Sequence, residues 1–119
     1  LADEGWMSVM SRQTQESAIH ELAKHPRTGV GVTKDGDLVI LVYSGRTTLS
    51  VGADYREMVT IARSIFPDMW RMMNVDGGGS SVLGMAVGNS FMELSYPATS
   101  ADNCAGMVRP INTILCLEP

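Results

Sequence analysis

Three consecutive glycines, residues 77–79, restrict the fold of this chain more than any other feature of its sequence. Glycine loses more conformational freedom on folding than any other residue, so such a run is unfavourable unless the fold requires bare backbone there. The run lies between Asp76 and a pair of serines, and apolar segments at 72–75 and 82–87 flank it on both sides. We therefore expect a loop that is held between two strands.

The chemistry open to this loop is anion binding. Backbone N–H groups of a glycine loop can turn toward one point, and the hydroxyls of Ser80 and Ser81 add further donors, which suits a phosphate. A tight crossing of two backbones explains the run equally well, so the loop alone leaves both interpretations open. A nucleotide P-loop requires lysine in place of Ser80, and a nucleophile elbow requires glycine two residues after its serine. A dinucleotide-binding loop leads into a helix, whereas a strand is expected here.

Composition excludes several classes of function. The chain has 119 residues, 45% of them hydrophobic, which is enough for one domain with its own core. Nine Lys and Arg against 13 Asp and Glu give a net charge of −4 without a basic block, which argues against a nucleic-acid partner. No apolar stretch reaches the length of a membrane span, and residues 1–4 do not resemble a signal peptide. Because the chain begins with Leu1, a processed product or an excised piece is expected, and localisation is weakly constrained.

Hydrophobic periodicity predicts two helices. One covers residues 14–24, where apolar side chains form a stripe, and the other covers 54–66, where Asp54 and Glu57 resemble a capping box. Alternating or continuous apolar segments with intervening turns predict strands at 29–33, 38–43, 72–75, 82–87, 91–94 and 111–117.

The wholly apolar segment 38–43 is expected to be a central strand, covered on both faces. The predicted fold is a single α+β domain over residues 1–119, a mixed and mainly antiparallel sheet with two helices packed on it. Cys104 and Cys116 are the only cysteines, and their spacing fits no zinc site and leaves a disulfide open beside two buried or free thiols.

Two arginines are expected at strand ends. Arg27 belongs to the segment His25-Pro26-Arg27-Thr28, in which proline fixes a corner before a strand, and Arg46 follows Gly45 after strand 38–43. A guanidinium group can hold a phosphate or a carboxylate there through paired hydrogen bonds. Considered singly, each arginine is explained as well by a solvated side chain beside a turn. We interpret His25 as a capping or packing residue rather than as a catalyst.

The order of these motifs resembles the phosphodiester glycosidase family. That family includes the mammalian enzyme that removes N-acetylglucosamine from a phosphodiester cap on lysosomal enzymes, together with bacterial and phage relatives. The resemblance covers residues 25–117, from His-Pro-Arg-Thr through Gly45-Arg46 and the loop Asp-Gly-Gly-Gly-Ser-Ser to Arg109-Pro110 before the last predicted strand. It implies hydrolysis of the glycosidic bond between a sugar's anomeric carbon and a phosphodiester oxygen. The implied substrate is a sugar-1-phosphodiester, a surface glycan or a teichoic-acid-like polymer.

The resemblance also implies the residues of the site. Asp76 would act as nucleophile, base or stabiliser of positive charge on the sugar ring, while the arginines hold the departing phosphate. One carboxylate alone is evident in the matched segment, so retention or inversion stays open. No metal ligands are predicted and no cofactor is certain, although a divalent cation stays open. The implied catalytic residues are Asp76, Arg27 and Arg46, and the implied substrate-binding residues are Thr28, Gly77, Gly78, Gly79, Ser80, Ser81 and Arg109.

Ser44 departs from the family pattern, which has an aspartate before the Gly-Arg pair. Family domains also extend further upstream, so we expect this chain to be the C-terminal portion of such a domain, either a fragment or a partner of a second chain that supplies the N-terminal half. Both departures favour an alternative function, a non-catalytic glycan-binding or structural module of a larger assembly such as a phage tail. A generic α+β domain with a packing loop is a third hypothesis. The hydrolase and the glycan-binding module both imply an extracellular, cell-surface or virion location. Both also require that the glycine loop and the Arg27 guanidinium face one cavity.

Overall fold

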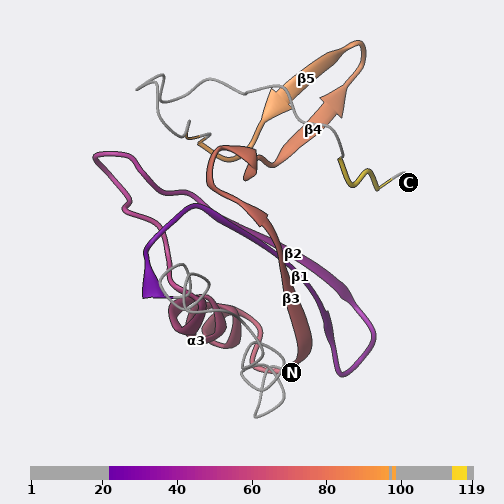
Figure 1. Cartoon of the computed structure of the whole chain (residues 1–119). Helices are drawn as coiled ribbons and strands as arrows, with labels where there is room; N and C mark the ends of the chain where they lie inside the picture. The colour runs from indigo at the N-terminus through magenta and orange to yellow at the C-terminus, as the bar shows by residue number, and fades with distance from the viewer. Residues whose placement is uncertain (1–21, 97, 99–113, 118–119) are drawn as a thin grey trace.

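The computed structural model describes residues 22–96, 98 and 114–117 (Figure 1). Within these ranges the chain forms one α-helix, one short 3₁₀ turn and five strands. In chain order they are β1 (Arg27–Thr33), β2 (Leu38–Tyr43), α3 (Tyr55–Ile65), β3 (Met69–Gly77), the 3₁₀ turn η1 (Gly78–Ser80), β4 (Gly84–Val87) and β5 (Ser90–Glu93).

The larger sheet has three antiparallel strands in the order β2-β1-β3. Arg27 at the start of β1 lies opposite Tyr43 on one side and opposite Gly77 on the other. The hairpin predicted around Asp35-Gly36 is therefore confirmed, but the prediction that 38–43 is the central strand was wrong. Among the described strands β2 pairs with β1 alone, and β1 is central. An apolar run predicts a strand with little exposed surface, whereas the pairing order depends on where β3 returns to the sheet.

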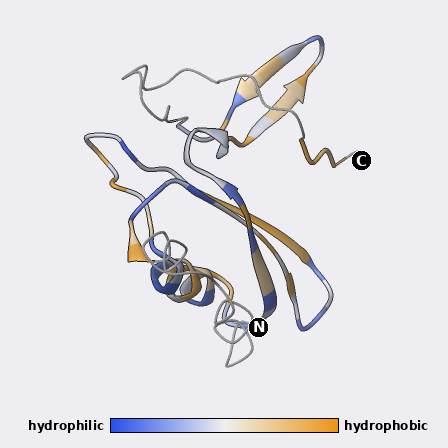
Figure 2. Ribbon diagram, viewed as in Figure 1, coloured by the Kyte–Doolittle hydropathy of each residue, from blue (hydrophilic) through white to orange (hydrophobic). Residues whose placement is uncertain are grey.

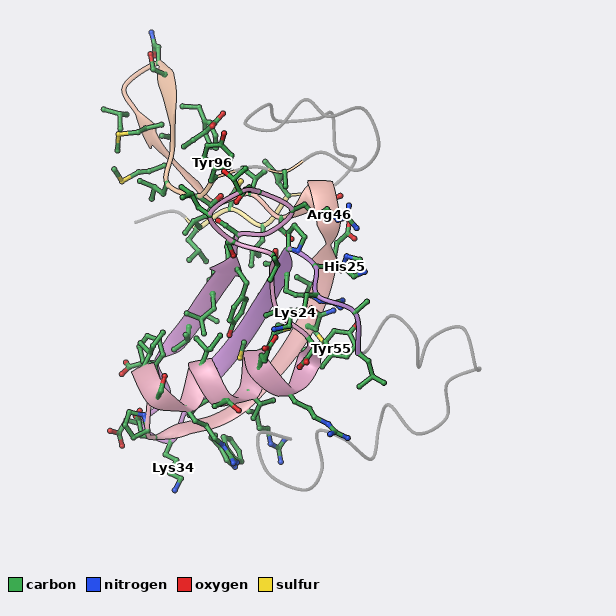
Figure 3. The ribbon with its side chains drawn as sticks, turned by 90° about the vertical axis from the view of Figure 1, so that its left-hand side faces the viewer. Lys24, His25, Lys34, Arg46, Tyr55 and Tyr96 are labelled. Atoms are coloured by element: carbon green, nitrogen blue, oxygen red, sulfur yellow. The ribbon has the colours of Figure 1, made fainter. Side chains whose placement is uncertain are left out.

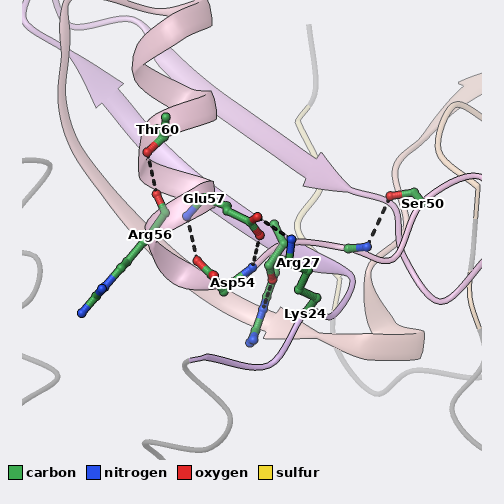
Figure 4. Close-up of polar contacts among 9 residues, drawn as sticks. Lys24, Arg27, Ser50, Asp54, Arg56, Glu57 and Thr60 are labelled. Atoms are coloured by element: carbon green, nitrogen blue, oxygen red, sulfur yellow. Dashed lines mark hydrogen bonds and ion pairs between the residues drawn. The ribbon is translucent and has the colours of Figure 1, made fainter.

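Helix α3 covers one face of this sheet (Figure 1) and confirms the helix predicted at 54–66. The predicted capping box is present, since the Asp54 carboxylate accepts from the N–H of Glu57 and the Glu57 carboxylate accepts from the N–H of Asp54 (Figure 4). Lys24 donates to Glu57 at 2.6 Å, and this hydrogen bond is the main reason that the pKa of Glu57 is lowered. The buried core between helix and sheet comprises Val39, Ala53, Met58, Ala62, Met69 and Met72.

Two glycines of β1 make room for this core. A Cβ on Gly31 would lie 3.0 Å from Cβ of Met72 and 2.9 Å from the sulfur of Met69, and a Cβ on Gly29 would collide with the end of the Met72 side chain. The alternation of glycine and valine in β1 thus leaves the face toward α3 bare, where methionine side chains lie across it. The valines occupy the other face.

That other face bears a row of apolar side chains, in which Val30 lies opposite Ile40 of β2 and Met73 of β3. Met73 is 64% exposed, and Leu38 at the start of β2 is 54% exposed. Figure 2 shows hydrophobic colour along parts of β1 and β2, and a mixture of hydrophobic and hydrophilic colour along β3. Within the described ranges, α3 is the one helix that packs on the sheet, and it packs on the opposite face.

Strands β4 and β5 form a separate two-stranded sheet. They pair from Gly84 opposite Glu93 to Val87 opposite Ser90, and Gly88 in the turn has a φ of +59°. The predicted hairpin around Gly88-Asn89 is confirmed, with a shorter first strand and a second strand that begins one residue earlier than predicted. Figure 1 shows it beyond the end of β3, away from α3.

Two predictions need correction or fall outside the described residues. The described chain contains one α-helix rather than two, because the helix predicted at 14–24 lies mostly on residues outside the described ranges. Residues 114–117 of the strand predicted at 111–117 have no regular secondary structure. The α+β class stands with a single described helix.

Cys116 is a free and exposed thiol, while Cys104 lies outside the described residues. The described residues include no helix long and apolar enough to span a membrane.

Candidate functional site

The corner at His25-Pro26 brings three segments of the chain together. His25 forms a two-way backbone bridge with Ala53, with N···O distances of 3.3 and 3.0 Å. Pro26 is fully buried, and its carbonyl accepts a hydrogen bond of 2.9 Å from the N–H of Gly78. The corner therefore ties the segment before α3 to the first turn of the glycine loop.

The structure holds Arg27 on the side of this corner that faces α3. Its side chain is 5% exposed, and its guanidinium donates to the carbonyls of Ala53 at 3.1 Å and Ala23 at 2.9 Å. It also lies 4.3 Å from the centre of the Tyr55 ring, a favourable cation–π contact. The aliphatic stem passes the loop, since its Cδ is 3.8 Å from where a Cβ of Gly77 would lie. Arg27 therefore reaches the loop with its stem, while these polar contacts point toward the helix.

The guanidinium of Arg46 faces the glycine loop. A Cβ on Gly78 would lie 3.4 Å from Nη1 of Arg46, and Nη2 is 3.0 Å from Nδ1 of His25. Figure 3 shows His25 and Arg46 as neighbours on the same side of the fold. A guanidinium group can only donate, so Nδ1 of His25 is the acceptor in this contact. Arg46 also has a φ of +54°, the one positive value for a residue other than glycine within the described ranges.

The glycine loop has a defined internal geometry. The carboxylate of Asp76 accepts from the N–H of Gly77 at 2.7 Å, and Gly78 has a φ of +62°. The N–H of Ser81 bonds to the carbonyl of Gly78 at 3.2 Å and closes the turn η1. Three of the loop N–H groups thus have partners within the protein. These three N–H groups are therefore not available to an anion in this conformation, whereas the guanidinium of Arg46 lies beside the loop.

Ser81 has a buried hydroxyl with no partner among the described residues, and its side chain is 2% exposed. A buried hydroxyl without a partner lowers stability, so such a group in a native fold calls for an explanation. Asp76, in contrast, lies exposed at the start of the loop. The loop therefore presents a carboxylate to solvent and keeps one hydroxyl inside.

The remaining sequence-predicted residues are less closely associated. Thr28 lies opposite Val42, and alternation along β1 directs its side chain to the face opposite that of Arg27. Gly79 is buried and Ser80 is partly buried within η1. Arg109 lies outside the described residues. Ser44, partly buried, accepts a hydrogen bond of 2.7 Å from Ser50 through its backbone carbonyl. In the described part of the chain, no three His, Cys, Asp or Glu side chains are grouped so that they could hold a metal ion.

Sequence reasoning missed His25 as a partner of Arg46. The two residues are separated by 21 positions. The available signal was that His25 directly precedes Pro26 in one motif and that Arg46 follows Gly45 in another. Nothing in either segment indicates that the two side chains meet.

We define the corner site as the corner His25-Pro26, Arg46 and the loop 76–81. A family model described as phosphodiester glycosidase matches residues 3–118, a range that includes the whole corner site. No curated protein and no solved structure is significantly similar to the chain. The match extends over nearly the full length of the sequence, so the chain belongs to the phosphodiester glycosidase family.

Proposed function

We propose that this protein hydrolyses the glycosidic bond between a sugar's anomeric carbon and a phosphodiester oxygen. Family membership supports the reaction class. The observation that carries the proposal is the position of the Arg46 guanidinium beside Gly78, with the exposed carboxylate of Asp76 at the start of the same loop. A carboxylate on the loop and a guanidinium beside it match the two charges that this reaction develops. The proposed substrate is a sugar-1-phosphodiester, a surface glycan or a teichoic-acid-like polymer, which would place the protein outside a cell or on a virion.

The chemistry follows from where charge appears. As the bond between the anomeric carbon and the phosphate oxygen breaks, positive charge grows on the ring and negative charge on the leaving phosphate, and a water molecule supplies the new hydroxyl of the sugar. Arg46 would hold the phosphate by preorganised electrostatics, and Asp76 would act on the ring as nucleophile, base or stabilising charge. A phosphate is a good leaving group, so a strong general acid is not required. From the sequence we expected the Arg27 guanidinium to face the same cavity as the loop, but its contacts to Ala23, Ala53 and Tyr55 point toward the helix. We therefore assign phosphate binding to Arg46, and Arg27 would support the site by fixing the corner.

The variant Asp76→Asn tests this proposal on a methyl diester of N-acetylglucosamine-1-phosphate. Asparagine keeps an oxygen that can accept from the N–H of Gly77, so the loop geometry and the melting temperature should change little. We expect sugar release to fall by about 100-fold or more. The matched control is Asp35→Asn, which removes an exposed carboxylate in the β1–β2 turn and should keep full activity. Equal turnover by Asp76→Asn and the parent protein would exclude the proposed role.

The alternative, a non-catalytic glycan-binding module, is favoured by one observation. Within the described residues, the side chain that contacts the Arg46 guanidinium is His25 rather than a carboxylate, and Ser44 stands where the family pattern has an aspartate. Incubation with a sugar-phosphodiester polymer separates the two functions, because binding without release of reducing sugar supports the module. In that case Ser44→Asp is the variant in which hydrolysis should appear if the missing carboxylate is the cause.

A further inference from the structure

We propose that His25 is a positioning residue, which holds the Arg46 guanidinium against the glycine loop in the orientation that binds phosphate. The inference rests on the proposed function and deepens it, since it concerns the phosphate-binding part of the same site. Its basis is the contact of 3.0 Å between Nη2 of Arg46 and Nδ1 of His25.

Arg46 has an exposed, long side chain that would otherwise sample many rotamers. Two contacts limit it here. Nη2 meets the His25 ring, while Nη1 lies against Gly78, where a Cβ would be 3.4 Å away. The contact with His25 uses one of the five N–H donors of the guanidinium, and the other donors are left for a ligand. An arginine held in this way loses less freedom when it binds a phosphate than a freely solvated arginine does.

His25 can act as an anchor because its own backbone is fixed. It forms the two-way bridge with Ala53 and precedes the buried Pro26. A Cβ on Gly52 would collide with the His25 carbonyl group, so these backbones lie in direct contact. The ring therefore projects from a rigid corner, and a hydrogen bond to it transmits that rigidity to Arg46.

The backbone of Arg46 provides a second, independent observation. Its φ of +54° is unfavourable for a side chain with a Cβ. Backbone strain of this kind persists where surrounding contacts enforce it, and it is enriched at ligand-binding sites. The strained residue is the one whose guanidinium spans His25 and the loop.

The test is a double-mutant cycle with inorganic phosphate as the probe, measured by isothermal titration calorimetry. We expect His25→Ala to weaken phosphate binding about tenfold and Arg46→Ala to weaken it at least as much. The double variant should bind no more weakly than Arg46→Ala, because His25 acts through Arg46. His25→Asn should restore most of the affinity, since its amide oxygen can accept from Arg46 near the position of Nδ1. Arg56→Ala, which removes an exposed cation from α3, is the charge-matched control and should bind as the parent does.

Additive losses in the double variant, or phosphate affinity unchanged in His25→Ala, would overturn the inference, as would a parent protein that binds no phosphate at millimolar concentration. Truncation of the His25 side chain leaves its backbone bridge intact, so circular dichroism should show that every variant folds. The two proposals fail separately. Phosphate binding with a non-additive cycle but without sugar release supports His25 and rejects hydrolysis, whereas sugar release that is equal in His25→Ala and the parent does the reverse.

Discussion

At the scale of single residues, the corner site depends on two glycines that carry no chemistry. Gly45 is buried, and a Cβ there would lie 2.6 Å from Cα of Gly52 and 2.9 Å from the nitrogen of Pro26. Gly52 itself has a φ of +100°, which favours glycine. The segment that carries Arg46 can approach His25 because these backbones touch without side chains between them.

The variant Gly45→Ala should therefore destabilise the fold and weaken phosphate binding together. The new methyl group meets backbone atoms, which cannot turn aside as a side chain can, and we expect a loss of about 3 kcal/mol in the free energy of unfolding. Gly36→Ala is the matched control, because nothing lies within 4 Å of its Cβ and only the strain of its φ of +95° remains, about 1 kcal/mol. Urea denaturation measures both variants. Equal losses at the two positions would contradict this account of Gly45.

The motifs that carry the corner site were identified from sequence where each is contiguous, but His25 was interpreted as a capping or packing residue. The glycine loop, the Arg27 corner and the Arg46 pair were all found in this way, and the loop does follow a strand as expected. Their spatial relation was not predictable, because it depends on the bridge between His25 and Ala53 and on the contact of Gly45 with Gly52. These contacts join segments that are distant in the chain, and neither local sequence indicates which other segment it will meet.

At the scale of elements, Tyr43 joins the edge strand β2 to helix α3. Its hydroxyl donates to the carbonyl of Met58 at 3.0 Å. Burial raises the pKa of Tyr43 from 10.0 to about 12, since the phenolate is poorly solvated in this position. The folded state therefore favours the neutral ring, and the neutral ring also makes the bond to the helix.

This raised pKa predicts a loss of stability in alkali. A group whose pKa is higher in the folded state contributes fully below its unfolded pKa, and its contribution declines as the pH rises toward the folded value. We expect the parent protein to lose stability between about pH 10 and pH 12 for this reason, and Tyr43→Phe to lose less over the same interval. Urea denaturation at a series of pH values measures it. Tyr96→Phe, which removes an exposed tyrosine, should behave as the parent; an identical decline in Tyr43→Phe would reject the assignment.

Elements were predicted well where the signal is local. The capping box of Asp54 and Glu57 and the turns at Asp35-Gly36 and Gly88-Asn89 all depend on neighbouring residues, and all three are present. The position of β2 in the sheet was predicted wrongly. A wholly apolar strand can have two apolar faces whether it is central or at an edge, so its composition does not decide its position. Strand β3 also begins earlier than predicted, at Met69, since its exposed Trp70 and Arg71 interrupt the apolar pattern.

At the scale of the whole molecule, the described chain divides into a sheet with a helix and a projecting hairpin. Leu83 closes the base of the hairpin β4–β5, since its carbonyl accepts from the N–H groups of Leu94 and Ser95 and its own N–H bonds to the hydroxyl of Ser95. Leu83 lies two residues after Ser81, the last residue of the glycine loop. The corner site therefore lies at the junction between the two parts.

The two parts should differ in local stability. Strand β1 is hydrogen-bonded on both sides and alternates between buried and partly buried residues. Among the described strands, β4 and β5 pair only with each other, and they are exposed apart from Gly84. A two-stranded hairpin of this kind is marginally stable by itself. We expect amide hydrogens of residues 27–33 to exchange with deuterium much more slowly than those of 84–93, measured by mass spectrometry of peptides from the intact chain. Equal protection in the two regions would mean that the hairpin gains stability from contacts beyond those of the described residues, and the corner site would then lie inside one cooperative unit rather than at the boundary between two.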